Sequence, residues 1–273
     1  MTTPQFDIRP SLIKGDPADA YLHWTKEVMR LESLNPKVLM DFSAPNSGVL
    51  CGVEEAKALL LNVLPKVEQD NQTNNGNDVV QVWAMEEGEK FEAGEPVLRV
   101  ISKYASFGLY ETSILGMLSS STGWATAAND CVESAGETTV IAYGARHIHP
   151  NVAHILDYAS VIGGCSSVST ILGSKHAGRN PIGNMPHSLP LLFGDTVAAA
   201  QAFDKHIGME TQRIVVVDTF KDEAEEALNV AEALRDRLRG IRLDTPFERG
   251  GVTPMLVREI RNRLDHMLSL IHI

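Results

Sequence analysis

His187 is the residue whose surroundings most clearly point to chemistry. It lies between a Gly-Asn-Met-Pro turn and an apolar run, in the stretch GRNPIGNMPHSLPLLFGDT. An imidazole in this place can be a satisfied core residue, a metal ligand, or a general acid, general base or phosphoryl-accepting nucleophile. Taken alone, the pattern favours a core histidine. The basic residues expected at the same edge of the fold favour an exposed imidazole that works beside phosphate.

Two aspartates follow apolar segments that are typical of buried strands. Asp218 ends VVVD and Asp244 ends IRLD, and each precedes a threonine. Carboxylates at strand ends can bind ribose hydroxyls, hold a hydrated metal ion or stabilise a cationic transition state. We therefore expect both to be functional, whereas Asp222 is expected only to cap the helix that follows it.

Arginines in the second half of the chain are candidates for an anion site. A guanidinium group binds phosphate or carboxylate through two parallel hydrogen bonds. Most arginines are surface or ion-paired residues, and this interpretation stays open for Arg249. Arg146 and Arg242 both follow predicted strands, so we expect these two to bind anionic groups.

The motif RHIHP suggests a different kind of site. On a strand, His147 and His149 would share one face and form half of a metal site, with Asp218 as a further ligand. This interpretation predicts a metal-dependent hydrolase on a barrel. No further cluster of histidines or cysteines completes the site, and Pro150 would leave His149 in a loop.

The elements that must position these residues change character near residue 111. Helices are predicted over 18–31 and 53–64, an Asn-rich loop over 69–78, and strands joined by glycine turns over 79–104. This pattern predicts an α+β domain over residues 1–110. The first of these helices is expected to be capped by Asp16.

Residues 111–273 predict an α/β fold. After a helix that begins at Glu111, short apolar segments alternate with helical ones, which is typical of βαβ units with a parallel sheet. Polar residues at successive strand ends favour a (β/α) barrel over an open sheet. About five units are present, fewer than the eight of a complete barrel, so we expect a C-terminally truncated barrel. The predicted strands are TTVIAYGAR, ASVIGG, NPIGNM, RIVVVDTF and GIRLDT.

The composition limits the function. Of 273 residues, 44% are hydrophobic and 22% are charged, as in a folded globular protein. The net charge of -11 disfavours a nucleic-acid partner. No apolar run reaches the roughly 20 residues of a membrane span, and three scattered cysteines read as reduced thiols. We expect a cytoplasmic protein without a membrane or nucleic-acid partner.

An ordered set of motifs resembles the nicotinate phosphoribosyltransferases. This family belongs to the type II phosphoribosyltransferases, which also include quinolinate and nicotinamide enzymes. The motifs span nearly the whole chain in family order. They are ADAYLHWT, ETSILGMLSSSTGWATAA, ARHIHP, VIGGCSSVS, GNMPHSL with FGDT, VDTFKDEAEEAL and GIRLDTPFERGG.

The resemblance implies a reaction of NAD biosynthesis. Nicotinate and phosphoribosyl pyrophosphate would give nicotinate mononucleotide and pyrophosphate, with coupled ATP hydrolysis and Mg²⁺ bound through substrate phosphates rather than directly by protein ligands. The histidine phosphorylated by ATP in this family falls on His187. Tyr21 would stack on the pyridine ring of a neighbouring subunit, which implies a homo-oligomer, a dimer or larger.

The resemblance also assigns the remaining residues. Asp218 and Asp244 are expected to act with His187 in catalysis, and Arg242 to bind the phosphoribosyl group beside Asp244. Arg146 would hold a carboxylate or phosphate. The other expected substrate-binding residues are Glu111, Thr122, His147, Ser169 and Arg249.

The chain departs from the family pattern in three places. Asn184 replaces a threonine of the histidine motif, and Ser166 replaces an acid. Family members also continue into further strands whose glycine-rich turns bind the 5′-phosphate, and this sequence ends before them. Three alternatives stay open: a decarboxylating quinolinate phosphoribosyltransferase, which would need more basic residues and no phosphohistidine; the metal-dependent hydrolase; and an inactive fragment.

Overall fold

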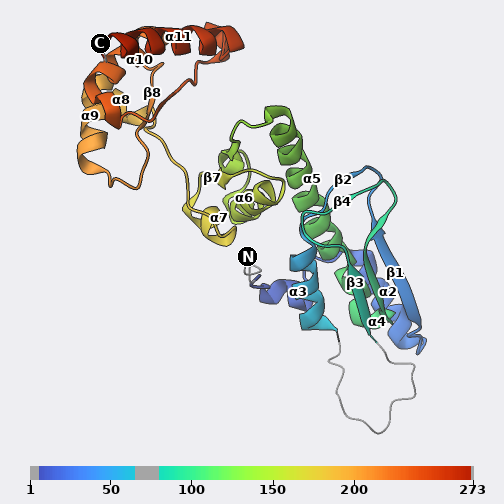
Figure 1. The fold of residues 1–273 in the computed structure, drawn as a ribbon. Helices are drawn as coiled ribbons and strands as arrows, with labels where there is room; N and C mark the ends of the chain where they lie inside the picture. The colour runs from blue at the N-terminus through green and yellow to red at the C-terminus, as the bar shows by residue number, and fades with distance from the viewer. Residues whose placement is uncertain (1–5, 65–79, 272–273) are drawn as a thin grey trace. The chain divides into compact units, whose positions relative to one another are not determined.

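The computed structural model describes residues 6–64 and 80–271 and has the mixed α/β fold that the sequence predicts (Figure 1). The chain divides into two compact units, which we call unit 1 (Met1–Pro181) and unit 2 (Ile182–Ile273). Each unit is described by itself. The Asn-rich loop predicted over 69–78 lies outside the described residues.

Unit 1 contains an antiparallel sheet in the order β1-β5-β3. Its strands are β1 (Lys37–Ser43), β3 (Gln81–Ala84) and β5 (Pro96–Lys103), and a separate pair joins β2 (Gly48–Val49) to β4 (Lys90–Phe91). Several buried residues of β5 alternate with partly exposed ones, as expected for a sheet with one face on a core. The strands predicted over 79–104 are confirmed.

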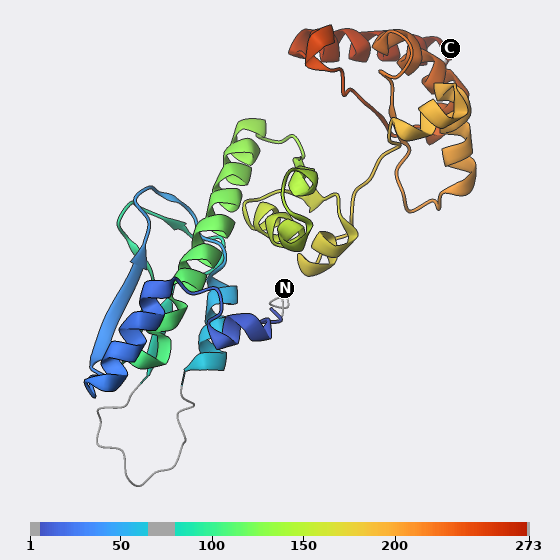
Figure 2. The same ribbon diagram turned by 180° about the vertical axis from the view of Figure 1, so that it is seen from behind.

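The helices that accompany this sheet are α1 (Pro10–Lys14), α2 (Ala20–Leu31), α3 (Val53–Val63), α4 (Tyr104–Phe107), η1 (Gly108–Tyr110) and α5 (Glu111–Ala135). The helices predicted over 18–31 and 53–64 and from Glu111 are confirmed. The expected cap is wrong, because the residue before α2 is Asp19 and not Asp16. Helix α5 contacts both α3 and β2 near the sheet and α6 in the following segment, as the view from behind in Figure 2 shows.

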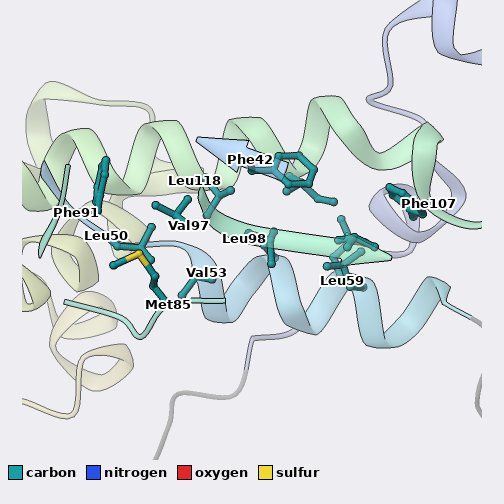
Figure 3. Packing of buried hydrophobic residues seen from close by; sticks show 14 of the residues in the cluster. Phe42, Leu50, Val53, Leu59, Met85, Phe91, Val97, Leu98, Phe107 and Leu118 are labelled. Atoms are coloured by element: carbon teal, nitrogen blue, oxygen red, sulfur yellow. The ribbon is translucent and has the colours of Figure 1, made fainter. Parts of the chain in front are cut away.

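The core of unit 1 lies between helices α3 and α5, with β5 running through it (Figure 3). Leu59 of α3, Leu98 of β5 and Leu118 of α5 face this core. Phe42 of β1 and Phe107 of α4 also belong to it. Burial of such side chains stabilises a fold by about 1.5–3 kcal/mol each. This core fixes the start of α5.

The second part of unit 1 begins the βαβ rhythm. It consists of β6 (Ile141–Ala142), η2 (Gly144–His147), η3 (Pro150–Val152), α6 (Ala153–Ile162), β7 (Ser167–Val168) and α7 (Ile171–His176). Strands β6 and β7 pair in parallel, as predicted. The predicted strand ASVIGG is wrong: Ala159–Ile162 continue helix α6, where the Ser160 hydroxyl donates to the Leu156 carbonyl one turn earlier.

Unit 2 contains the parallel pair β8 (Ile214–Val216) and β9 (Gly240–Arg242). Its helices are α8 (Ser188–Phe193), α9 (Thr196–His206), α10 (Glu223–Leu234), η4 (Arg235–Arg237), η5 (Phe247–Arg249) and α11 (Pro254–Ile271). Helix α10 packs against both α9 and α11, and Val215, Val216 and Val230 lie in the core that they enclose (Figure 1).

The segment NPIGNM forms no strand, contrary to prediction. A backbone hydrogen bond joins it to β8, from the Met185 N–H to the Ile214 carbonyl, at 3.0 Å. Pro181 and Pro186 have no N–H to donate, so they cannot extend a ladder. The contact at Met185 fixes the backbone two residues before His187.

The predicted domain boundary at residue 110 stays a prediction. The two compact units divide at Pro181, within the part of the chain assigned to the barrel. The reason is that α5 packs on α3 and β2 as well as on α6. Among the described residues, no helix is both long and apolar enough to cross a membrane.

Candidate functional site

His187 lies at the centre of a cluster of charged residues in unit 2. It occupies the position before helix α8, directly after the GNMP turn. Its Nε2 lies 3.0 Å from Asp218 Oδ1, and its Nδ1 lies 3.8 Å from Asp244 Oδ2. Because a carboxylate oxygen only accepts, the Nε2–H of the imidazole donates to Asp218. His187 is therefore oriented by one carboxylate and flanked by a second.

The two carboxylates differ in their surroundings. The Asp218 side chain is 1% exposed, whereas that of Asp244 is 46% exposed. Asp218 follows strand β8 and Asp244 follows β9, and these strands are parallel neighbours. Their carboxyl ends therefore bring the two aspartates to the same edge, as the sequence predicts.

Asp244 and Asn184 both hold the Arg242 guanidinium group. Its Nη2 donates to Asp244 Oδ2 at 2.6 Å, and its Nη1 donates to Asn184 Oδ1 at 3.0 Å. Asn184 is the residue that replaces the threonine of the family pattern. The side-chain amide oxygen reaches the guanidinium group, so this departure adds a contact that orients Arg242.

Two buried polar atoms beside His187 have unused hydrogen-bonding capacity. In the described part of the chain, Asp218 Oδ2 and Thr219 Oγ1 are buried and have no hydrogen-bond partner. Such atoms are rare in folded proteins, because an unmade buried hydrogen bond is costly. Each of these atoms can therefore form one further hydrogen bond.

Unit 1 places a second group of the predicted residues at the end of a parallel strand pair. Arg146 and His147 are exposed in η2, just after β6. Ser169 follows β7, and its N–H donates to the Ala142 carbonyl of β6 at 3.2 Å. The three residues thus share the carboxyl ends of β6 and β7.

The structure does not build the alternative metal site at RHIHP. His149 Nδ1 accepts a hydrogen bond from the Asn151 N–H at 3.2 Å, which caps the start of η3. Among the described residues, no group of three or more His, Cys, Asp and Glu side chains is arranged to hold a metal ion. The geometry gives the hydrolase interpretation no support.

Tyr21 and Glu111 lie near the junction of helices α2 and α5. The Tyr21 hydroxyl donates to Asp19 Oδ2 at 3.2 Å, and the Thr112 hydroxyl donates to the same oxygen at 2.8 Å. The negative charge of Asp19, and to a smaller extent that of Glu111, raises the pKa of Tyr21. The Tyr21 side chain is exposed and is available to contact a ligand or another chain.

Two predicted binding residues have contacts within the fold. The Thr122 hydroxyl donates to the Cys51 carbonyl at 3.0 Å and accepts from the Cys51 N–H at 3.2 Å, so it fastens α5 to the segment after β2. Arg249 is exposed in η5, with Nη2 3.7 Å from Glu223 Oε1. Their roles in substrate binding stay predictions.

Sequence reasoning missed two residues next to the cluster, Glu223 and Glu226. Both are buried in the first turn of α10 and contact the chain that follows the two aspartates. A signal was present in the sequence. The two acids lie three residues apart and fall on the same helical face as Ala227 and Val230, where an apolar residue is expected.

Two domain families match nearly the whole chain. Residues 19–122 match the family described as the N-terminal domain of quinolinate phosphoribosyl transferase, and residues 124–269 match its C-terminal domain. The two matches are consecutive and in the order that the family names imply.

Two solved structures and one curated protein are similar to this chain. A nicotinate-nucleotide pyrophosphorylase from Pyrococcus furiosus is 39% identical with a TM-score of 0.85, over 97% of this chain and 66% of that protein. NadC from Streptococcus pyogenes has a TM-score of 0.63 at 15% identity, over 95% of this chain and 83% of its own. The nicotinate phosphoribosyltransferase pncB2 of Mycobacterium tuberculosis is 28% identical over 189 residues, 67% of this chain and 39% of that protein. The chain thus spans less than two thirds of the first and third relatives.

The predicted nicotinate reaction with ATP hydrolysis is wrong. Both matching domain families are described by quinolinate, whereas the named nicotinate enzyme is a more distant relative. The prediction depended on GNMPHSL, and the two family matches outweigh this one short motif.

Proposed function

Because the chain belongs to the quinolinate phosphoribosyltransferase family, we propose that it transfers a phosphoribosyl group to the ring nitrogen of quinolinate. Phosphoribosyl pyrophosphate would be the donor, and nicotinate mononucleotide, pyrophosphate and CO₂ the products. The observation that carries the proposal is the cluster of His187, Asp218, Asp244 and Arg242, with Asp218 Oδ2 buried and unpartnered among the described residues.

The cluster suits the charge that develops in this transfer. When pyrophosphate leaves, the anomeric carbon of ribose becomes cationic, and a carboxylate held nearby in a water-poor site stabilises that charge. Asp218 provides such a carboxylate, because its free oxygen is buried and His187 fixes its orientation. The same oxygen can accept a ribose hydroxyl.

Arg242 is the proposed contact for an anionic part of the donor. Its guanidinium group is fixed by Asp244 and Asn184 and remains 27% exposed. A fixed guanidinium loses little conformational entropy when it binds phosphate. Arg146 and His147, which are exposed in unit 1, are proposed to bind an anionic group.

Mg²⁺ is part of the proposal as an ion carried by the phosphates of the donor. It binds oxygen ligands, retains several water molecules and commonly enters a site with substrate phosphates. The half-exposed Asp244 fits an acceptor for its water ligands. The ion would supply charge neutralisation for the leaving pyrophosphate. The proposed reaction does not use ATP.

A homo-oligomer is also proposed. Tyr21, Trp24, Val28 and Leu31 of helix α2 are 54–68% exposed and are spaced so that they share one face. An apolar stripe of this kind is typical of a surface covered by a partner. We define these four residues as the α2 stripe.

Binding of the donor tests the proposed site directly. Calorimetry with phosphoribosyl pyrophosphate and Mg²⁺ should show binding that Asp218→Asn weakens by about tenfold or more, because the amide loses the charge that orients His187 and accepts ribose. Asp195→Asn, an exposed helix cap at the start of α9, is the matched control and should bind the donor as the unaltered protein does. Equal affinity of all three proteins would sink the assignment of this cluster.

A further inference from the structure

The first turn of helix α10 carries two buried carboxylates that the proposed chemistry does not use. Glu223 is 5% exposed and Glu226 is 3% exposed. A buried charge is costly unless hydrogen bonds and favourable dipoles compensate it. Both side chains lie at the N-terminus of α10, where the helix dipole stabilises negative charge. Asp222 fixes where that turn begins, since its Oδ1 accepts from the Ala224 and Glu225 N–H groups.

Glu226 holds the chain that follows Asp218. Its Oε1 accepts from the N–H groups of Phe220 at 3.0 Å and Lys221 at 3.2 Å, and its Oε2 lies 3.3 Å from the Thr219 nitrogen. The Thr196 hydroxyl also donates to Oε1, at 3.0 Å. Successive backbone amides after Asp218 therefore converge on one carboxylate.

Glu223 does the same for the chain that follows Asp244. The Thr245 hydroxyl donates to Glu223 Oε1 at 2.8 Å, and Thr245 is itself buried. Arg249 Nη2 lies 3.7 Å from the same oxygen, which places a positive charge near it. Thr245 is the next residue after Asp244, so its anchor limits where the Asp244 carboxylate can move.

The two anchors are one helical turn apart. Residues i and i+3 of a helix are neighbours on its surface, and here each is joined to the residue after one aspartate of the cluster. The segments that follow Asp218 and Asp244 are therefore both held by the first turn of helix α10. Apolar side chains could fill the same volume, but they could not accept from the backbone amides.

We propose that Glu223 and Glu226 are positioning residues that set the two aspartates of the phosphoribosyl site. This inference rests on the proposed function of that site. Glu226 acts through Asp218 and Glu223 acts through Asp244. Neither touches His187 in the hydrogen bonds described above, so their effect reaches the imidazole only through the aspartates.

The test uses two readouts on the full chain. The first is the proton resonance of His187 Nε2–H, which reports the hydrogen bond to Asp218. The second is the affinity for phosphoribosyl pyrophosphate with Mg²⁺. Glu226→Gln keeps one acceptor oxygen but turns an amide N–H group toward a backbone donor. It should move or broaden the His187 resonance and weaken donor binding by about tenfold to a hundredfold, as expected for a misplaced group.

Three further variants make the result specific. Glu223→Gln should weaken donor binding while the His187 resonance stays in place, because it acts on Asp244. Thr196→Val removes one donor from Glu226 with little change in volume, and it replaces Glu226→Gln if that variant does not fold. Glu225→Gln is the matched control, since this exposed acid of the same turn pairs with the Lys221 ammonium group at the surface, and it should leave both readouts unchanged.

A Glu226→Gln protein that only melts at a lower temperature, with an unchanged His187 resonance and donor affinity within about twofold, would show a merely structural role and overturn the proposal. If the unaltered protein binds no donor at all, the proposed function fails. The His187 resonance then still decides whether Glu226 sets Asp218.

Discussion

Among single residues, the two aspartates of the cluster differ in burial and therefore in the role that each can take. Asp218 is buried against His187, whereas Asp244 is half-exposed and pairs with Arg242. The buried carboxylate keeps its orientation because the imidazole donates to it, and its second oxygen is left for a ligand. The exposed carboxylate is screened by water and by the guanidinium group, so it suits an ion that arrives with its own water ligands.

Two neighbouring histidines of unit 1, His154 and His176, predict that the free energy of unfolding depends on pH. His154 and His176 have ring centroids 5.5 Å apart, and in the described part of the chain His154 Nδ1 and His176 Nε2 are buried without a partner. Burial is the main cause that lowers the pKa of both residues, and the charge of Arg9 adds to it for His154. Both imidazoles therefore resist protonation in the folded state.

The sign of the effect follows from linkage. The unfolded chain takes up protons on these histidines as the pH falls below about 6.5, before the folded protein does, so the free energy of unfolding decreases on acidification. His176→Phe keeps an aromatic ring beside Phe6 and Tyr158 but cannot titrate. Denaturant melts between pH 8 and pH 5 should show a smaller decrease for this variant, whereas Tyr158→Phe should follow the unaltered protein. Parallel curves for His176→Phe would contradict the explanation.

The sequence predicted functional residues that come directly after a strand. It did not predict contacts that depend on where two side chains point. Asp218, Asp244 and Arg242 were expected at one edge because apolar strands precede them, and the structure brings them together with His187. The contact between Asn184 and Arg242 depends on two side chains that are 58 positions apart. No pattern in the sequence indicates that contact.

At the level of helices and strands, α2, α3, α5, α10 and α11 were predictable because apolar residues recur at helical spacing in each of them. The error at ASVIGG arose because a short apolar run fits a buried strand and the end of a buried helix equally well. In the structure Ala159–Ile162 are the last residues of helix α6, which packs on α5. The missed strand β7 has only two residues and no periodicity of its own.

The packing of α5 on the end of α6 predicts a strict requirement for glycine. A Cβ atom on Gly163 would overlap the Ala125 carbonyl oxygen of α5 and lie 2.8 Å from Ala128 Cβ. Gly163→Ala should therefore lower the free energy of unfolding by about 1–3 kcal/mol, as overpacking does. The measurement is a denaturant melt of each variant.

The matched control for this prediction lies on α5 itself. Gly123 has no atom within 4 Å of an added Cβ, so Gly123→Ala should stabilise the protein by up to about 1 kcal/mol through helix propensity. A stabilising effect of Gly163→Ala would mean that α5 and α6 are not as close as described.

In the molecule as a whole, each of the two compact units has its own candidate residues. Unit 2 contains the complete His187 cluster, and unit 1 contains Arg146 and His147 as well as the α2 stripe. The division at Pro181 was not foreseen, because periodicity identifies elements and does not show which core each element joins. Helix α5 is the example, since it packs on both parts of unit 1.

The α2 stripe predicts how the molecule associates. The double variant Trp24→Gln/Val28→Gln should lower the mass measured by light scattering toward that of the single chain, because it removes apolar area from the interface. Its melting temperature, read at low protein concentration, should change little, since both side chains are exposed. Lys26→Gln, on the opposite face of α2, is the control. A monomeric unaltered protein would contradict the proposed homo-oligomer.

Release of the second carboxylate of quinolinate distinguishes the proposed reaction from transfer to nicotinate. The protein is incubated with Mg²⁺, phosphoribosyl pyrophosphate and quinolinate labelled in the carboxylate next to the ring nitrogen, without ATP. A parallel reaction contains nicotinate and ATP. We predict labelled CO₂ and nicotinate mononucleotide in equal amounts from quinolinate, and their loss in Asp218→Asn. Nicotinate mononucleotide formed only in the parallel reaction, with no CO₂ from quinolinate, would contradict the assignment.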